Sequence, residues 1–235
     1  MSGNNGTKRR YPPLHVKLYQ LATGIIWLLL KLLAKPHVEG RERVPMEGPV
    51  IVVTNHLHHL DVAAGVTIPR PAWVLAAEKY EHHIFGPILR IAGAIFIDRG
   101  EPDRSALRQA LNVLEDGNAL AIAVEGTRSR TGALAEGKLG TAYLATRSGA
   151  TVVPLAIWGT ENIIPAWKRL RRADVYIRYG EPMRFPKGKA RTAELEEYTK
   201  EIMVSLARLL PEEYRGIYRD HPEVKRHSLT DASQA

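Results

Sequence analysis

The chain has 235 residues, which is enough to bury the core of one large α/β domain. Its composition is ordinary for a folded protein, and the absence of cysteine excludes disulfides and thiolate metal sites. With 33 Lys and Arg against 25 Asp and Glu, the formal charge is +8, which favours an anionic partner, either nucleic acid or an anionic lipid surface; the alternative is a solubilising charge without a partner.

Residues 1–36 form a basic and apolar N-terminal segment. Within it, residues 21–34 are strongly apolar and are interrupted only by Lys31. A helix of this length would extend about 21 Å, which is short of the ~30 Å hydrocarbon core of a bilayer. Trp27 is a residue type favoured at the headgroup level, and basic residues precede the run. We therefore predict a helix that lies in the membrane interface; the alternative is a helix packed on the core of the domain.

Apolar runs typical of buried strands alternate with helix-like segments through residues 37–215. The predicted strands are residues 50–54, 73–76, 94–98, 119–124 and 152–157, and the predicted helices are residues 84–92, 103–115, 139–147 and 193–210. This alternation predicts a single-domain α/β sandwich around a largely parallel or mixed sheet. Residues 216–235 are polar and are predicted to be a disordered tail.

Chemically active side chains come directly after three of the predicted strands. His56 follows residues 50–54, Arg99 follows residues 94–98, and the loop of residues 125–128 follows residues 119–124. Loops at strand ends carry function in such folds. We therefore expect these three segments at one edge of the sheet.

His56 and Asp61 have the residue types of a general base and its orienting carboxylate. Residues five apart are rotated by about 140° on a helix, so the two meet only if His56 lies in a loop and Asp61 in the first turn of the next helix. A carboxylate bonded to one ring nitrogen fixes the tautomer and stabilises the imidazolium. Imidazole titrates near neutral pH, which suits it to taking a proton from a hydroxyl group.

The histidine cluster also suggests an alternative, a metal-dependent hydrolase. His56, His58 and His59 lie beside Asp61, much as in the His-x-His-x-Asp-His pattern of metallo-β-lactamase-type enzymes. Here the aspartate comes one residue late, and Val62 stands in place of the last histidine.

Two further motifs resemble ligand-binding sequences. Gly132, Gly137 and Lys138 imitate a phosphate-binding loop, but Leu139 replaces the Ser or Thr that would hold magnesium, which excludes triphosphate binding. The basic run of residues 168–172 has no nucleic-acid-binding signature beside it, so we expect no nucleic-acid partner. The apolar residues 163–167 next to it favour a membrane-facing patch over a solvated loop.

Four blocks of the chain resemble the 1-acylglycerol-3-phosphate acyltransferase family, in the order of that family. The blocks are Asn55 with His56-x4-Asp61, residues 93–99, residues 125–129 and residues 153–155. The resemblance implies transfer of a fatty acyl group from acyl-CoA or acyl-carrier protein to the sn-2 hydroxyl of 1-acylglycerol-3-phosphate (lysophosphatidic acid), giving phosphatidic acid. His56 would deprotonate the hydroxyl and Asp61 would orient His56. No metal or cofactor is implied, and glycerol-3-phosphate or another lyso-polar lipid is the alternative acceptor.

The resemblance also implies a binding set for the substrate. Its members are Asn55, Arg99, Glu125, Gly126, Thr127, Arg128 and Lys138. Gly126 lets backbone N–H groups approach a phosphate, Arg128 offers a bidentate fork, and Glu125 would orient a hydroxyl or an arginine. The chain departs from the family at Ala123 and Val124, where relatives usually have Phe-Pro, and at Lys79, whose match is poor. The expected location is monotopic, on the anionic cytoplasmic face of the cell membrane, where acyl-carrier protein would be a partner if it is the donor.

Overall fold

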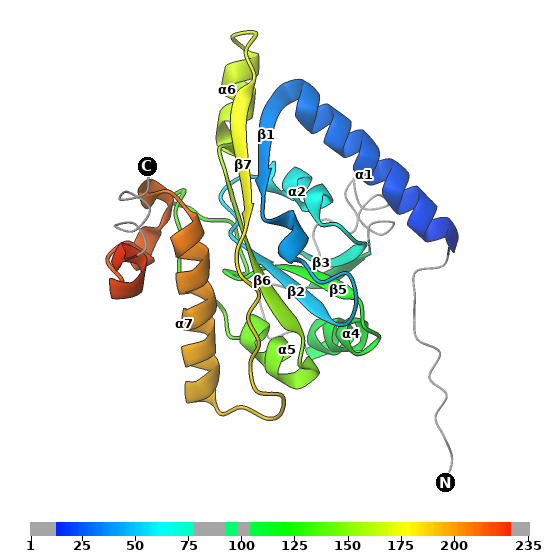
Figure 1. Cartoon of the computed structure of the whole chain (residues 1–235), viewed down its shortest axis with the longest axis vertical. Helices are drawn as coiled ribbons and strands as arrows, with labels where there is room; N and C mark the ends of the chain where they lie inside the picture. The colour runs from blue at the N-terminus through cyan, green and yellow to red at the C-terminus, as the bar shows by residue number, and fades with distance from the viewer. Residues whose placement is uncertain (1–12, 78–92, 98–103, 227–235) are drawn as a thin grey trace.

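The computed structural model describes residues 13–77, 93–97 and 104–226, and its centre is a seven-stranded sheet with the order β1-β7-β6-β2-β5-β3-β4 (Figure 1). The strands are β1 (Ala34–Glu39), β2 (Val50–Thr54), β3 (Ala72–Ala77), β4 (Ala94–Ile97), β5 (Ala119–Ala123), β6 (Thr151–Trp158) and β7 (Ala173–Tyr179). Five of the six neighbouring pairs are parallel, and β6 with β7 is antiparallel.

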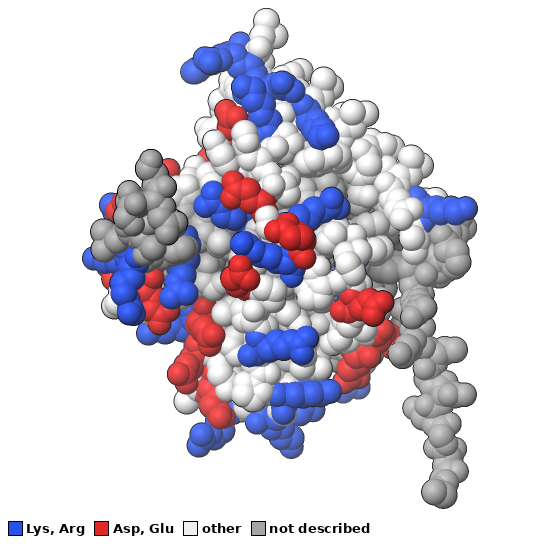
Figure 2. Space-filling view, viewed as in Figure 1, with Lys and Arg blue, Asp and Glu red and all other residues white. Residues whose placement is uncertain are grey.

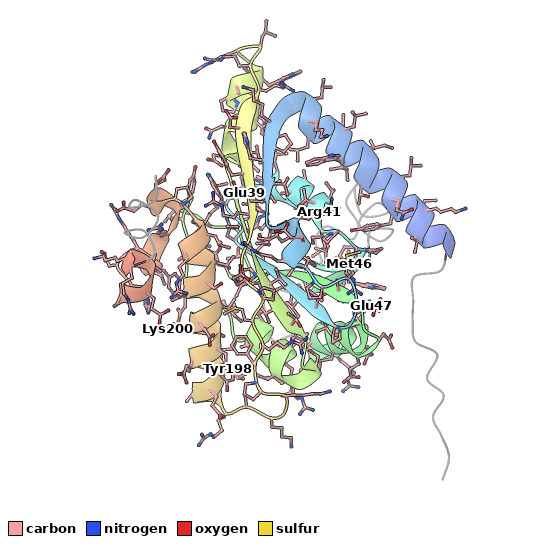
Figure 3. The ribbon with its side chains drawn as sticks, viewed as in Figure 1. Glu39, Arg41, Met46, Glu47, Tyr198 and Lys200 are labelled. Carbon is pink, nitrogen blue, oxygen red and sulfur yellow. The ribbon has the colours of Figure 1, made fainter. Side chains whose placement is uncertain are left out.

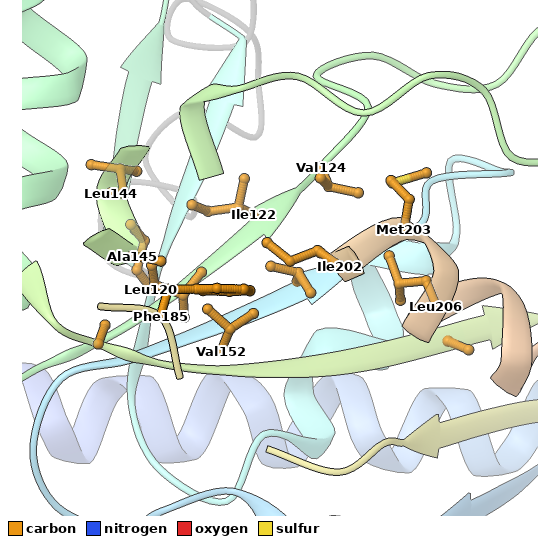
Figure 4. Close-up of a cluster of buried hydrophobic side chains, with 14 of the residues drawn as sticks. Leu120, Ile122, Val124, Leu144, Ala145, Val152, Phe185, Ile202, Met203 and Leu206 are labelled. Carbon is orange, nitrogen blue, oxygen red and sulfur yellow. The ribbon is translucent and has the colours of Figure 1, made fainter. Parts of the chain in front are cut away.

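Helices cover both faces of the sheet. They are α1 (Pro13–Leu33), α2 (Asp61–Ala64), α4 (Arg104–Glu115), α5 (Gly140–Ser148), α6 (Ile163–Trp167) and α7 (Thr192–Leu209). Because side chains alternate along a strand, Ile51 and Val53 of β2 face the cluster formed with α4, α5 and α7, whereas Val50 and Val52 face the cluster formed with α1 and α2. Figure 4 shows the first cluster, where α7 packs on the side chains of β5 and β6. With both faces covered, all eight residues of β6 are buried.

The predicted fold class is confirmed, and so are the predicted elements within the described residues. The five predicted strands and three of the predicted helices are present with ends shifted by a residue or two, and residues 84–92 lie outside the described residues. Two edge-region strands were missed. β1 is short, polar at alternate positions and contains Pro36, which only an edge strand tolerates. β7 alternates buried and exposed residues, a period of two that could have revealed it.

The N-terminal helix is longer than predicted. α1 has 21 residues, or about 31 Å, so the length argument against a membrane span was wrong. Its Val16–Leu33 stretch is long and apolar enough to cross a membrane by length and composition alone, which weakly suggests membrane association. α1 nevertheless lies along the domain: Leu30 is buried in the core, and Trp27 and Leu33 pack against it. Its opposite side exposes Leu18, Leu21, Ile25, Leu28, Leu29 and Leu32. One side of α1 therefore packs on the core, as the second alternative expected, and the other side is apolar and exposed.

Two predicted boundaries need correction. The N-terminal segment was predicted to end at residue 36, which falls inside β1. Residues 216–226 were predicted to be disordered but are folded: the Ile217 N–H donates to the Leu134 carbonyl at 3.3 Å, and Val224 is fully buried. Residues 227–235 lie outside the described residues.

Candidate active site

Three loops meet at the carboxyl edge of the sheet because β5, β2 and β6 are adjacent and parallel. The loop after β5 is bonded directly to the loop after β2, since the Ser129 N–H donates to the His56 carbonyl at 2.8 Å. On its other side, the Lys138 N–H donates to the Val124 carbonyl at 2.8 Å. Main-chain hydrogen bonds therefore bring together the two motifs that are about seventy residues apart in the sequence.

His56 and Asp61 form the predicted pair. His56 lies in the loop, Asp61 is the first residue of α2, and the His56 Nδ1 is 3.3 Å from the Asp61 Oδ2. The Asp61 side chain is 3% exposed and the His56 side chain 16%. The carboxylate is held further by the His58 N–H, which donates to Oδ2 at 2.7 Å. With Nδ1 directed at Asp61, the ring can accept a proton at Nε2, as a general base requires.

Thr160 is a member of the site that the sequence analysis missed. Its hydroxyl donates to the Asp61 Oδ1 at 2.5 Å, and the side chain is buried. The preceding residue, Gly159, has a φ of +85°, and a Cβ there would lie 2.4 Å from the Asp174 carbonyl oxygen, so this turn requires glycine. Thr160 follows the predicted strand 152–157, so the rule that selected His56 and Glu125 could also have selected it.

Glu125 is buried behind the histidine and is only 2% exposed. Its Oε2 accepts the Ala135 N–H at 2.9 Å, and its Oε1 has no hydrogen-bond partner among the described residues. Burial raises the pKa of this carboxyl group, against the lowering effect of the Ala135 and His56 N–H groups. Glu125 therefore forms part of the buried wall of the site.

Replacing Glu125 with glutamine should make the protein more stable at pH 8 but not at pH 4. A carboxyl group whose pKa is raised by folding contributes stability below its ordinary pKa, and that stability is lost as pH rises through the folded pKa. We expect a Tm above that of wild type at pH 8 and no such gain at pH 4. Thermal unfolding at both pH values measures it, with the exposed Glu136→Gln as control. Equal gains for Glu125→Gln at pH 4 and pH 8 would contradict the assignment.

Basic side chains line the outer margin of the site. The Arg128 Nη1 lies 2.8 Å from the His59 Nδ1, so the guanidinium group lies beside the loop that carries the dyad. Thr127 and Lys138 are exposed. A Cβ on Gly126, whose φ is +70°, would lie 3.3 Å from the Lys138 Cγ, so the glycine and lysine are close neighbours. Thr127, Arg128 and Lys138 therefore lie near one another, close to the loop that carries His56.

One of the predicted substrate-binding residues, Asn55, is not brought to this margin. Asn55 is fully buried: its Nδ2 donates to the Ile157 carbonyl at 2.7 Å, and its Oδ1 accepts the Ile157 N–H at 2.9 Å. Its amide ties the end of β2 to β6, so a role of Asn55 in binding substrate stays a prediction that this geometry does not support. Arg99, like Lys79, lies outside the described residues. The strand before it, β4, is three strand spacings from β2, or about 14 Å.

The described residues do not favour the metal-dependent hydrolase. Within residues 13–77, 93–97 and 104–226, no three His, Asp or Glu side chains are grouped so that they could hold a metal ion. The ring of His59 is contacted by the cationic Arg128, and Asp61 is held by His56, His58 and Thr160.

A buried carboxylate behind a histidine, beside a basic loop at the carboxyl edge of a parallel sheet, suits an enzyme that activates a hydroxyl group for group transfer. A family-level comparison matches residues 35–158 to the acyltransferase family. The chain belongs to the acyltransferase family.

Named relatives refine this comparison. A probable 1-acyl-sn-glycerol-3-phosphate acyltransferase of Mycoplasma pneumoniae is 31% identical over 176 residues, covering 70% of this chain and 64% of the relative. The 1-acyl-sn-glycerol-3-phosphate acyltransferase of Borreliella burgdorferi is 29% identical over 129 residues, covering 53% of this chain and 52% of the relative. The chain thus spans about half to two thirds of the length of these two curated relatives. The crystal structure of the 1-acyl-sn-glycerophosphate (LPA) acyltransferase of Thermotoga maritima superimposes with a TM-score of 0.65 at 27% identity, covering 83% of this chain and 80% of that one.

Proposed function

We propose that the protein transfers a fatty acyl group from acyl-CoA or acyl-carrier protein to the sn-2 hydroxyl of 1-acylglycerol-3-phosphate, giving phosphatidic acid. The observation that carries the proposal is the His56–Asp61 pair, held at 3.3 Å in a loop that is bonded through Ser129 to the basic margin at Arg128. The printed activities of the relatives support the choice of acceptor.

The geometry suggests how the reaction proceeds. The His56 Nε2 takes the proton of the acceptor hydroxyl as its oxygen attacks the thioester carbonyl carbon. The tetrahedral intermediate then collapses, the C–S bond breaks, and the imidazolium returns the proton to the thiolate. Asp61, fixed by Thr160 and the His58 N–H, stabilises the imidazolium throughout. Arg128 and Lys138 hold the acceptor phosphate, and the acyl thioester supplies the reactive carbonyl without a further cofactor.

A product assay tests the function directly. Purified protein is supplied with an acyl thioester, either acyl-CoA or acyl-carrier protein, and with lysophosphatidic acid, glycerol-3-phosphate or a lysophospholipid that carries another headgroup. Phosphatidic acid from lysophosphatidic acid is the expected product. Preference for another acceptor would establish the alternative acyltransferase. Hydrolytic activity that rises in proportion to the zinc bound by the protein would establish the hydrolase.

Replacing Arg128 with alanine should raise the KM for lysophosphatidic acid roughly 10- to 100-fold and change the KM for the acyl donor little. A charge-assisted phosphate contact contributes about 1.5–3 kcal/mol. Arg128→Lys should rescue in part, because a point charge replaces the planar fork. Steady-state kinetics with each substrate varied separately measure the effect. Arg130→Ala is the matched control, since Arg130 is exposed in the same loop. An equal rise in both KM values would contradict a phosphate site at Arg128.

We further propose that α1 attaches the protein to the cytoplasmic face of the membrane, with its exposed apolar side in the interface. Leu28→Asp combined with Leu29→Asp should strongly weaken binding to anionic vesicles. These side chains are 68% and 50% exposed, so the fold should survive. Each buried leucine contributes about 1.5–3 kcal/mol against ~1 kcal/mol per basic residue, so high salt should weaken wild-type binding without abolishing it. Co-sedimentation with vesicles at low and high salt measures the binding. Complete release of the wild-type protein from the vesicles by high salt would refute the apolar attachment.

A further inference from the structure

α6 and the loop that leads from it to β7, residues 163–172, form a projecting tip (the α6–β7 tip; top of Figure 1). Its large apolar side chains face outward: Ile164 is 50% exposed, Trp167 60% and Leu170 95%. Leu170 also has a φ of +54°, a left-handed conformation that is unfavourable for a leucine. A backbone that presents such a side chain to solvent suggests that the side chain has a partner elsewhere.

The same tip is basic. Lys168, Arg169, Arg171 and Arg172 are exposed, residues 163–172 contain no acidic residue, and Figure 2 shows basic side chains gathered at this end of the molecule. The three arginines line a hollow of about 450 Å³. Of the acidic residues that line the hollow, Asp174 is paired with His37 at 2.9 Å, and Glu213 is the other. Exposed apolar residues bordered by arginines are complementary to an anionic lipid surface.

The tip continues the exposed apolar side of α1. The Arg172 Nη1 donates to the Lys31 carbonyl at 3.0 Å, which ties the base of the tip to the last turn of α1, near the exposed Leu28 and Leu32. The tip also begins close to the site, since Thr160, which holds Asp61, precedes Ile163 by only a few residues.

We propose that the α6–β7 tip is a second membrane-docking element. Ile164, Trp167 and Leu170 enter the interfacial layer of an anionic bilayer, and the neighbouring arginines pair with lipid phosphates. A single helix leaves the domain free to roll about the helix axis. A second contact point removes that freedom and fixes the carboxyl edge of the sheet relative to the bilayer. The proposal concerns lipid contact alone, so it stands or falls independently of the acyl-transfer reaction.

The absence of cysteine from the chain allows a direct test with single labels. Each of three variants carries one environment-sensitive fluorophore on a new cysteine. Leu170→Cys places it on the tip and Leu28→Cys places it on α1. Ile217→Cys places it at an exposed apolar position outside both. With vesicles of phosphatidylcholine and phosphatidylglycerol, the labels at positions 170 and 28 should shift to the blue and be quenched by a lipid-borne quencher. The label at position 217 should not respond. A response at position 28 without one at 170 would overturn the proposal, and so would no response at either.

Paired charge reversals test the arginine and lysine contacts without touching the apolar residues. Lys168→Glu with Arg171→Glu should weaken vesicle binding at least tenfold. The control, Lys189→Glu with Lys200→Glu, changes the net charge equally on exposed residues outside the tip; Figure 3 shows Lys200 on α7, away from the tip. Equal weakening by the two pairs would mean a general charge effect and would overturn the docking role. Loss of a protein partner from the Leu170→Asp variant, with vesicle binding unchanged, would also overturn it.

Discussion

Replacing His56 with alanine should lower the rate of acyl transfer about 10²- to 10⁴-fold and leave the fold intact. Loss of a general base has an effect of this size. The fold should survive because the ring is partly exposed and makes its hydrogen bond to Asp61, whose carboxylate keeps the His58 N–H and the Thr160 hydroxyl. The kcat with lysophosphatidic acid measures the loss, and thermal unfolding checks the fold.

His58→Ala is the matched control for this experiment. It removes a neighbouring imidazole but keeps the backbone N–H that donates to Asp61, so its effect on kcat should be much smaller. Residual activity of the His56 variant above one tenth of wild type would remove His56 from the role of base. If His56, His58 and His59 variants lost activity equally and in step with bound zinc, the metal-dependent mechanism would replace the present one.

Asp61→Asn should also lower kcat by about 10²- to 10⁴-fold. An amide keeps the shape of the carboxylate but permits the wrong histidine tautomer and cannot stabilise the imidazolium by charge. A KM for lysophosphatidic acid close to that of wild type would show that the loss lies in the chemical step. A kcat within a few-fold of wild type would show that Asp61 is merely a structural residue.

Thr160 gives a finer test of the same network. Thr160→Val leaves the Asp61 Oδ1 buried without its donor, so kcat should fall less than for Asp61→Asn, and Thr160→Ser should restore it. A purely structural role would lower stability in both variants without this rescue of kcat.

Local sequence patterns predicted much of the fold. The apolar runs of β2 and β6 are buried on both faces and were recognisable as strands, and α4, α5 and α7 were recognisable as helix-like segments between or after the strands. The mixed pattern of β1 was not recognisable, because an edge strand is buried on one side and tolerates polar residues and proline. The outward apolar side of α1 was anticipated, but its length was not, because residues before Leu21 are less apolar.

By itself, the sequence determined that His56 and Asp61 can meet, since a strand, a loop and the first turn of a helix bring them together within six residues. Only the tertiary structure decided which distant residues complete the site. Because β6 lies beside β2 in the sheet, Thr160 reaches Asp61, and the backbone of Ile157 is hydrogen-bonded to the side-chain amide of Asn55. Parallel neighbours are joined by long crossovers, so no short-range pattern specifies their order. The same holds for the α6–β7 tip, whose place beside α1 depends on the antiparallel return of β7 and its pairing with β1.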